Sequence, residues 1–169
     1  MLDNTSADKD LGTLQKIFLV FISLSLVVSL FFFRSGFKAN SMLDQLAKNS
    51  LEPDIALSNG KPTVFEFYAD WCEACKEMAP DMVAVEKLNS NKIDLVLLNV
   101  DNSKWVDLID EYDVNGIPKL TFFDSKGELK GSSIGVKNYS ELSEIFIALI
   151  NNNELPSFTK SSYSSNLNS

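Results

Sequence analysis

The chain of 169 residues contains no histidine, a single arginine and only two cysteines. Without histidine it can form neither a Ser-His-Asp triad nor a Cys-His nucleophile pair, and a metal site could have no imidazole ligand. The 23 acidic side chains outnumber the 15 basic ones, and a net charge of −8 disfavours binding to nucleic-acid phosphates. The length suits one domain with short extensions. Chemistry must therefore come from carboxylates, lysines and the two thiols.

A long apolar run occupies residues 17–33, with three serines as its only polar residues. As a helix it would measure about 25 Å, slightly less than the roughly 30 Å hydrocarbon core of a bilayer. Lys16 and Arg34 bracket the run, where long cationic side chains can reach the headgroups. A cleaved signal peptide is the alternative, but the leader is not basic and bulky residues follow the run. We predict one uncleaved transmembrane helix, whose orientation the flanking charges leave open.

After this run, the apolar pattern predicts alternating strands and helices. β-branched and aromatic residues predict strands at 63–69 and 93–100, the second a central parallel strand because it is almost uniformly apolar. Three- and four-residue spacing predicts a helix over 73–89 and a shorter one over 104–112. A hairpin and a final helix complete the pattern, with strands at 119–124 and 128–134 and helical positions Leu142, Ile145, Phe146, Leu149 and Ile150. The order β-α-β-α-β-β-α predicts an α/β fold whose mixed sheet is covered by helices on both faces.

The expected domain organisation has five segments along the chain. They are a leader at 1–16, the transmembrane anchor at 17–33, a linker with a short helix at 34–57, a folded domain at 58–150 and a tail at 151–169. The tail is rich in asparagine and serine, so we expect it to be mobile.

The two cysteines, Cys72 and Cys75, follow a predicted strand and begin a predicted helix. The first helical turn has unpaired N–H groups and the positive end of the helix dipole, and both favour a thiolate at Cys72. Cys75, three residues on, could resolve a mixed disulfide formed by Cys72. A structural disulfide closing so short a loop would stabilise the fold weakly, and zinc needs about four ligands. A two-thiolate copper(I) site is the remaining alternative to redox exchange.

The segments FEFYADWCEACKEMAPDM, LVLLNVDNSKW and YDVNGIPKLTFFD resemble the thioredoxin-like proteins. The resemblance is closest to the membrane-anchored TxlA family of cyanobacteria and to its chloroplast relative of cytochrome b6f assembly, and it covers residues 58–150. It implies a thioredoxin-like fold with Cys72 and Cys75 as the catalytic redox pair, and neither a cofactor nor a metal. It also implies that Glu66 is the buried carboxylate that exchanges protons with Cys75, and that Pro118 is a cis-proline facing the redox pair.

The same resemblance implies a substrate-binding surface around the cysteines. The backbone of Ile117 would pair with substrate as an added strand, Gly135 would leave the groove open, and Trp71 would pack over the site or lie in the core. Two positions depart from thioredoxins. Glu73-Ala74 stands where they carry Gly-Pro, and Leu97 replaces a lysine near the buried acid.

The function implied is thiol:disulfide exchange with protein substrates, in which the protein reduces the cysteines of apocytochromes during cytochrome assembly. The resemblance implies a thylakoid or plasma membrane, with the domain in the lumen or periplasm, and a membrane electron donor of the DsbD or CcdA type. A disulfide-donating oxidase of the same fold is one alternative. A redox-inactive membrane-tethered interaction module or copper carrier is another.

Overall fold

The computed structural model describes residues 12–159, except the side chains of residues 13–14 and 31–41. The chain divides into two compact units, Met1–Phe37 and Lys38–Ser169, and helix α1 (Thr13–Asn49) runs through both. Most of the predicted leader at 1–16, and residues 160–169 of the predicted tail, lie outside the described residues.

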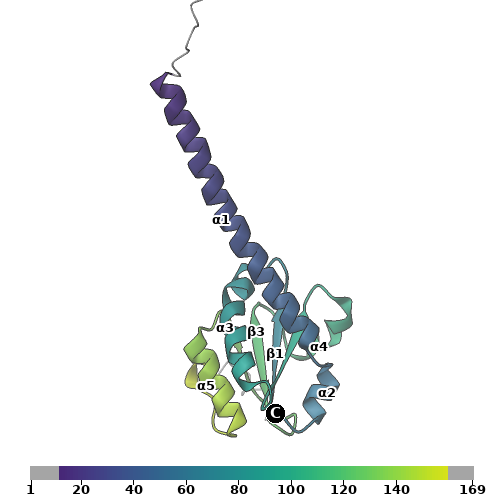
Figure 1. Cartoon of the computed structure of the whole chain (residues 1–169). Helices are drawn as coiled ribbons and strands as arrows, with labels where there is room; N and C mark the ends of the chain where they lie inside the picture. The colour runs from purple at the N-terminus through teal and green to yellow at the C-terminus, as the bar shows by residue number, and fades with distance from the viewer. Residues whose placement is uncertain (1–11, 160–169) are drawn as a thin grey trace, which may run out of the picture. The chain divides into compact units, whose positions relative to one another are not determined.

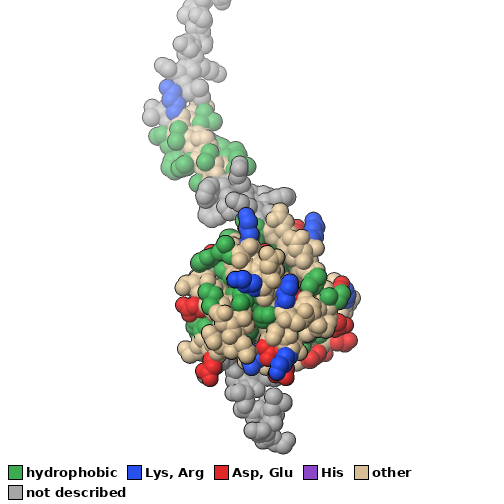
Figure 2. Space-filling view, turned by 60° about the horizontal axis from the view of Figure 1, so that its bottom comes forward, with side chains coloured by type: hydrophobic (Ala, Val, Ile, Leu, Met, Phe, Trp, Pro, Cys, Tyr) green, Lys and Arg blue, Asp and Glu red, His purple; other side chains and the backbone are tan. Residues whose placement is uncertain are grey.

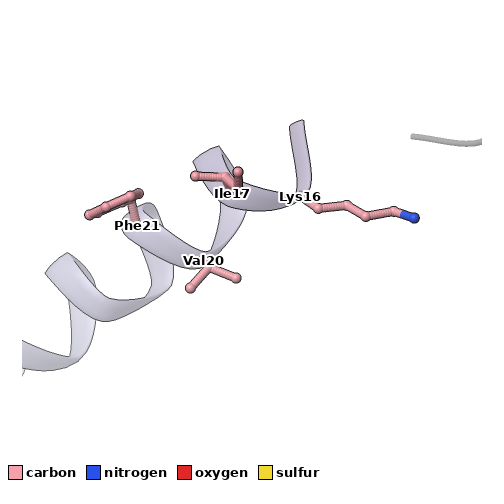
Figure 3. A pocket seen from close by; sticks show the side chains of 4 residues that line it. All are labelled: Lys16, Ile17, Val20 and Phe21. Carbon is pink, nitrogen blue, oxygen red and sulfur yellow. The ribbon is translucent and has the colours of Figure 1, made fainter. Parts of the chain in front are cut away.

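In its described residues, from 12 onward, the first unit is formed by the N-terminal part of α1. Its large apolar side chains between Ile17 and Leu30 are 44–67% exposed and appear in green in Figure 2. A shallow recess on this helix is lined by Lys16, Ile17, Val20 and Phe21 (Figure 3). All four residues belong to the same helix, so the recess is a feature of the helix surface. Among the described residues, none of the helices combines the length and the apolar character that crossing a membrane requires.

The second unit is built on a four-stranded mixed sheet in the order β2-β1-β3-β4, of which β1 and β3 are labelled in Figure 1. The strands are β1 (Thr63–Tyr68), β2 (Asp94–Asn99), β3 (Lys119–Phe123) and β4 (Leu129–Ile134). β1 pairs in parallel with β2 and antiparallel with β3, which continues into the β3–β4 hairpin. This confirms the predicted mixed α/β architecture.

Helices cover both faces of the sheet, and each face has its own apolar core. On one face the C-terminal end of α1 packs with α3 (Glu73–Asn89) and α5 (Tyr139–Ile150), and Figure 1 shows α3 and α5 side by side. On the other face lie α2 (Pro53–Ser58), the short 3-10 helix η1 (Ser103–Trp105) and α4 (Val106–Glu111). Alternation along β1 sends Val64 and Tyr68 to the α3 face, and Phe65 and Phe67 to the α4 face.

The position of β2 corrects one prediction. The uniformly apolar run at 93–100 forms a parallel strand as expected, but this strand lies at the edge of the sheet. Helices cover both of its faces, so an edge strand here is as apolar as a central one. Part of its outer edge is bonded by Ser50, which directly follows α1. The hydroxyl of Ser50 accepts the Leu97 N–H at 2.9 Å and lies 3.5 Å from the carbonyl of Leu95.

Helical structure before β1 is more extensive than expected. α1 continues to Asn49, and Leu43 and Leu46 on its last turns are buried in the core of the α3 face. At the other end of the domain, residues 151–159 include the 3-10 helix η2 (Ser157–Thr159), where Thr159 is buried. The mobility predicted for residues 160–169 stays a prediction.

Candidate active site

Cys72 and Cys75 form a disulfide across the first turn of α3, with an S–S distance of 2.16 Å and their Cα atoms 5.3 Å apart. Cys72 is the N-cap residue, and its sulfur accepts the backbone N–H of Cys75 at 3.1 Å. The helix starts here because β1 ends at Tyr68 and the chain turns through a bond from the Cys72 N–H to the Ala69 carbonyl. After reduction, the Cys75 N–H can donate to a thiolate on Cys72, which is how a helix N-terminus activates a thiol.

Charges in this first turn act in opposite directions on a thiolate. Glu73 is exposed beside Cys72, and a negative charge there disfavours a second one. Lys76 pairs with Glu73 at 2.9 Å, which offsets part of that repulsion. Both cysteines belong to the core of the α3 face, and Cys75 is the more deeply buried. Cys72 is thus the sulfur that a partner can reach more easily, while Cys75 is enclosed.

Glu66 lies in the middle of β1 and is completely buried. It shares the α3 face with the cysteines, since it alternates with Val64 and Tyr68. Its neighbours across the sheet are Leu97 on β2 and Leu120 on β3, both in the same apolar core. Neither of its carboxyl oxygens has a hydrogen-bond partner, and burial raises its pKa to about 8. The carboxyl therefore holds its proton at neutral pH.

The Ile117–Pro118 peptide bond is cis, and it immediately precedes β3. The Pro118 carbonyl accepts the N–H of Gly135 at 2.9 Å, which joins this loop to the end of β4. Ile117 is half-buried and packs against the apolar cores of both faces. Gly135 has a φ of +95°, in the region that favours glycine, and a Cβ placed there would meet nothing within 4 Å. The sequence-predicted Ile117, Pro118 and Gly135 therefore lie together at one end of the β3–β4 hairpin.

Trp71 is 64% exposed, so it is not the core residue that sequence reasoning allowed as an alternative. Its indole N–H donates to Asp101 at 2.8 Å. Asp101 is held in turn, because its N–H donates to the side chain of Asn99 at 2.9 Å. Sequence reasoning did not name Asp101. The available signal was that β1 and β2 are parallel neighbours, which brings the residues after their carboxyl ends together.

Thiol–disulfide exchange is the chemistry that this arrangement can perform, because it offers a dithiol, a helix N-terminus and a buried acid on one face. Within residues 12–159, no three His, Cys, Asp or Glu side chains are grouped so as to hold a metal ion.

Comparisons with known proteins agree with this geometry. A family model described as Thioredoxin matches residues 30–148. The chain is 44% identical to the chloroplastic thioredoxin-like protein HCF164 of Arabidopsis thaliana over 130 residues, which make up 77% of this chain and 48% of that protein. It is 36% identical to the thiol:disulfide interchange protein TxlA of Synechococcus elongatus over 118 residues, with 70% and 62% covered.

A TxlA homolog of Synechocystis is 36% identical over 140 residues, and the match covers 81% of this chain and 75% of the homolog. The chain spans about half the length of the Arabidopsis relative. These relatives confirm the resemblance predicted from the segments around Cys72 and Pro118. The chain therefore belongs to the thioredoxin family and, within it, to the TxlA-like thiol:disulfide interchange proteins.

Proposed function

We propose that this protein is a thiol:disulfide oxidoreductase that exchanges the Cys72–Cys75 dithiol or disulfide with protein substrates. The observation that carries the proposal is the disulfide across the first turn of α3, where the Cys72 sulfur accepts the Cys75 N–H. In the reducing direction, the Cys72 thiolate attacks a substrate disulfide and releases one substrate thiolate. Cys75 then attacks the Cys72 sulfur of the mixed disulfide. The second substrate thiol leaves, and two electrons have passed to the substrate.

Glu66 is proposed as the proton acceptor for Cys75. The Cys75 thiol must lose its proton before its sulfur can attack, and the chain has no histidine to receive it. Glu66 lies on the same face of the sheet as Cys75, and its raised pKa places its titration near the working pH of such an exchange. Its two oxygens are without partners in the oxidised state, so in the molecules whose Glu66 is ionised either oxygen can take the proton.

The substrate surface is proposed to comprise Trp71, Ile117, Pro118 and Gly135. Trp71 offers an exposed aromatic face next to Cys72, fixed through Asp101. The backbone of Ile117 would pair with the substrate chain as an added strand. Gly135 leaves the approach free of a side chain.

Two cysteine variants test the exchange. Cys72→Ser should abolish the acceleration that the protein gives to the reduction of insulin by dithiothreitol, because the thiol at the helix N-cap is gone. Cys75→Ser should trap mixed disulfides that thiol reagents release. A Cys72→Ser variant that still catalyses insulin reduction would exclude this mechanism, and a Cys75→Ser variant that traps no partner would argue against protein substrates.

We further propose that residues 17–33 anchor the domain to a thylakoid or plasma membrane, with the domain in the lumen or periplasm. The support is the uncharged run in the sequence, the exposure of its described apolar side chains, and a relative that is named chloroplastic. Carbonate extraction of membranes tests the anchor, because an anchored protein stays in the pellet. Protease protection in intact membranes tests the side.

Within that setting, we propose that the protein receives electrons from a membrane donor of the DsbD or CcdA type and reduces the cysteines of apocytochromes. Part of a DsbD protein of Yersinia pestis is 35% identical to this chain over 81 residues, which supports chemistry of the same kind. A redox titration of the Cys72–Cys75 couple tests the direction. A potential near that of thioredoxin, about −270 mV, supports a reductase, whereas one near −120 mV would indicate a disulfide-donating oxidase.

A further inference from the structure

Lys119, the first residue of β3, is a buried lysine outside the redox chemistry described so far. Only 5% of its surface is exposed. Its ammonium group donates to two backbone carbonyls, that of Tyr112 at 2.6 Å and that of Asp113 at 2.8 Å. An ammonium is costly to bury unless its donors are satisfied, and these two short bonds satisfy two of the three. The buried ammonium therefore links the start of β3 to the Tyr112 and Asp113 carbonyls.

The two carbonyls lie where α4 ends and the chain reverses. Tyr112 is the C-cap residue of α4, and Asp113 adopts a left-handed conformation with a φ of +47°. Carbonyls at a helix C-terminus lack partners within the helix, and a lysine side chain is a suitable donor for them. Burial lowers the pKa of Lys119, and the nearby charge of Asp113 opposes this change.

Lys119 ends the loop that begins at Tyr112, and its side chain reaches back to the start of this loop, as its two hydrogen bonds show. The loop leaves α4 at Tyr112 and returns at Lys119, and the two bonds close it six and seven residues apart. The other side of the loop is fixed by the Gly135 N–H, which donates to the Pro118 carbonyl. The segment between these two attachments contains Ile117.

The Lys119 side chain lies on the α4 face of the sheet, opposite the redox pair. Its neighbours in β3, Leu120 and Phe122, belong to the core of the α3 face, so Lys119 points the other way. Its cross-strand partner Phe67 is in the core of the α4 face, which agrees with this placement. The ammonium therefore acts on the loop and not on the sulfurs.

We propose that Lys119 is a positioning residue that holds the 113–118 loop in the conformation that receives a protein substrate. This inference rests on the exchange proposed above. It separates two steps that the exchange combines. Binding of an extended substrate along Ile117 depends on Lys119, whereas the reaction of the Cys72 sulfur with a small disulfide does not. Loss of the two bonds detaches the start of β3 from the end of α4, so the loop between them samples conformations that cannot pair with substrate.

The test compares Lys119→Met with wild type on two substrates, insulin and the small disulfide DTNB. Methionine keeps an unbranched apolar side chain but has no donor. We expect the KM for insulin to rise at least fivefold with kcat within twofold, and the rate with DTNB to stay within twofold of wild type. Lys119→Arg, which keeps the charge and the donors, should restore the insulin KM to within threefold. The matched control is Lys130→Met on the exposed part of β4, which should leave both substrates unchanged.

The outcomes separate this inference from the proposed function. If wild type reduces neither substrate, the proposed function itself fails. If wild type reduces both and Lys119→Met keeps an insulin KM within twofold, or loses insulin and DTNB activity equally, the positioning role is overturned. Should Lys119→Met not fold, Lys119→Gln takes its place under the same criteria, because its shorter side chain cannot reach both carbonyls.

Discussion

The buried carboxyl of Glu66 makes stability depend on pH in a way that one substitution can isolate. Its pKa is raised by burial from an ordinary value of 4.5 to about 8 in the folded protein. Below pH 4.5 the group is protonated in both the folded and the unfolded chain, so it costs nothing. Between pH 4.5 and 8 the unfolded chain releases the proton while the folded chain keeps it. The folded state then binds more protons, so stability falls as pH rises.

The size of this loss follows from the two pKa values. Each unit of difference between the two pKa values is worth about 1.4 kcal/mol. Over the whole window from pH 4.5 to 8, the free energy of unfolding therefore falls by about 5 kcal/mol. The free energy of unfolding of a whole folded domain is about 5 to 15 kcal/mol. Glu66→Gln removes the titration, so the variant should match wild type near pH 5 and become the more stable protein by several kcal/mol at pH 8.5.

Urea denaturation of the oxidised proteins at pH 5, 7 and 8.5 measures this difference. Titrations elsewhere in the chain cancel when the variant is compared with wild type at each pH. Glu128→Gln, at an exposed position of the β3–β4 hairpin, is the control: it keeps Glu66, so its stability should run parallel to that of wild type over the three pH values. If the free energies of unfolding of Glu66→Gln and wild type differ by less than 1 kcal/mol at every pH from 5 to 8.5, the carboxyl is not desolvated as the structure implies.

The same variant separates stability from turnover. Ionised Glu66 is the proposed base for Cys75, so wild-type insulin reduction should gain a pH-dependent component between about pH 6 and 8, as the carboxyl ionises. Glu66→Gln should lack that component and turn over more slowly while remaining at least as stable. A variant whose pH–rate profile coincides with that of wild type would show that Glu66 takes no part in proton transfer.

Three further substitutions test the fold that supports the site. Gly127→Ala should destabilise by at least about 2 kcal/mol in urea denaturation, since Gly127 has a φ of +75° and the new Cβ would lie 2.6 Å from the Leu57 carbonyl oxygen. Gly60→Ala, with a φ of +84° and open space, is its control at about 1 kcal/mol, and equal losses would refute the steric argument. Asn138→Ala should cost about 1 kcal/mol because it breaks the capping box of α5 with Glu141, and an unchanged urea midpoint would contradict that. Ser50→Ala should cost about 1 kcal/mol and speed amide exchange at Leu97, whose N–H loses its acceptor; unaltered exchange would show that water replaces the hydroxyl.

Much of the fold could be predicted because its signals are local. Apolar spacing marked helix α3 at its observed bounds, and β-branched and aromatic residues marked β1 to within a residue. The edge position of β2 could not be predicted, because strand order depends on pairing between distant segments and both faces of this strand are covered. A short helix was expected within residues 34–57, but not that α1 would run without a break to Asn49. Among the described side chains of this segment, those of residues 42–49, the exposed ones are polar, and the packing of Leu43 and Leu46 on a core built from later parts of the chain supports the helix.

The candidate site, too, could be predicted only where its signals are local. The cysteine pair was visible because a strand–helix junction is a local feature, and Glu66 was visible as an acid in an apolar strand. The partners that fix the site come from elsewhere in the chain. Asp101 holds Trp71 across a separation of 30 residues, and Lys119 looks in the sequence like any lysine at the start of a strand. Such contacts require the three-dimensional arrangement, because neither composition nor spacing distinguishes these two residues from solvated surface charges.

The absence of histidine makes the surroundings of Glu66 more important than they would be in a chain with other bases. A buried acid can be tuned by a charged partner or by burial alone, and here Leu97 and Leu120 flank it on both sides. A cation at either position would hold the carboxyl ionised and lower its pKa, leaving it ready to accept a proton but weak as a base. With apolar neighbours, the carboxyl ionises only near pH 8 and is then a stronger base. The cost in stability worked out above is the same desolvation that gives Glu66 this basicity, so one physical cause links the pH dependence of folding to that of turnover.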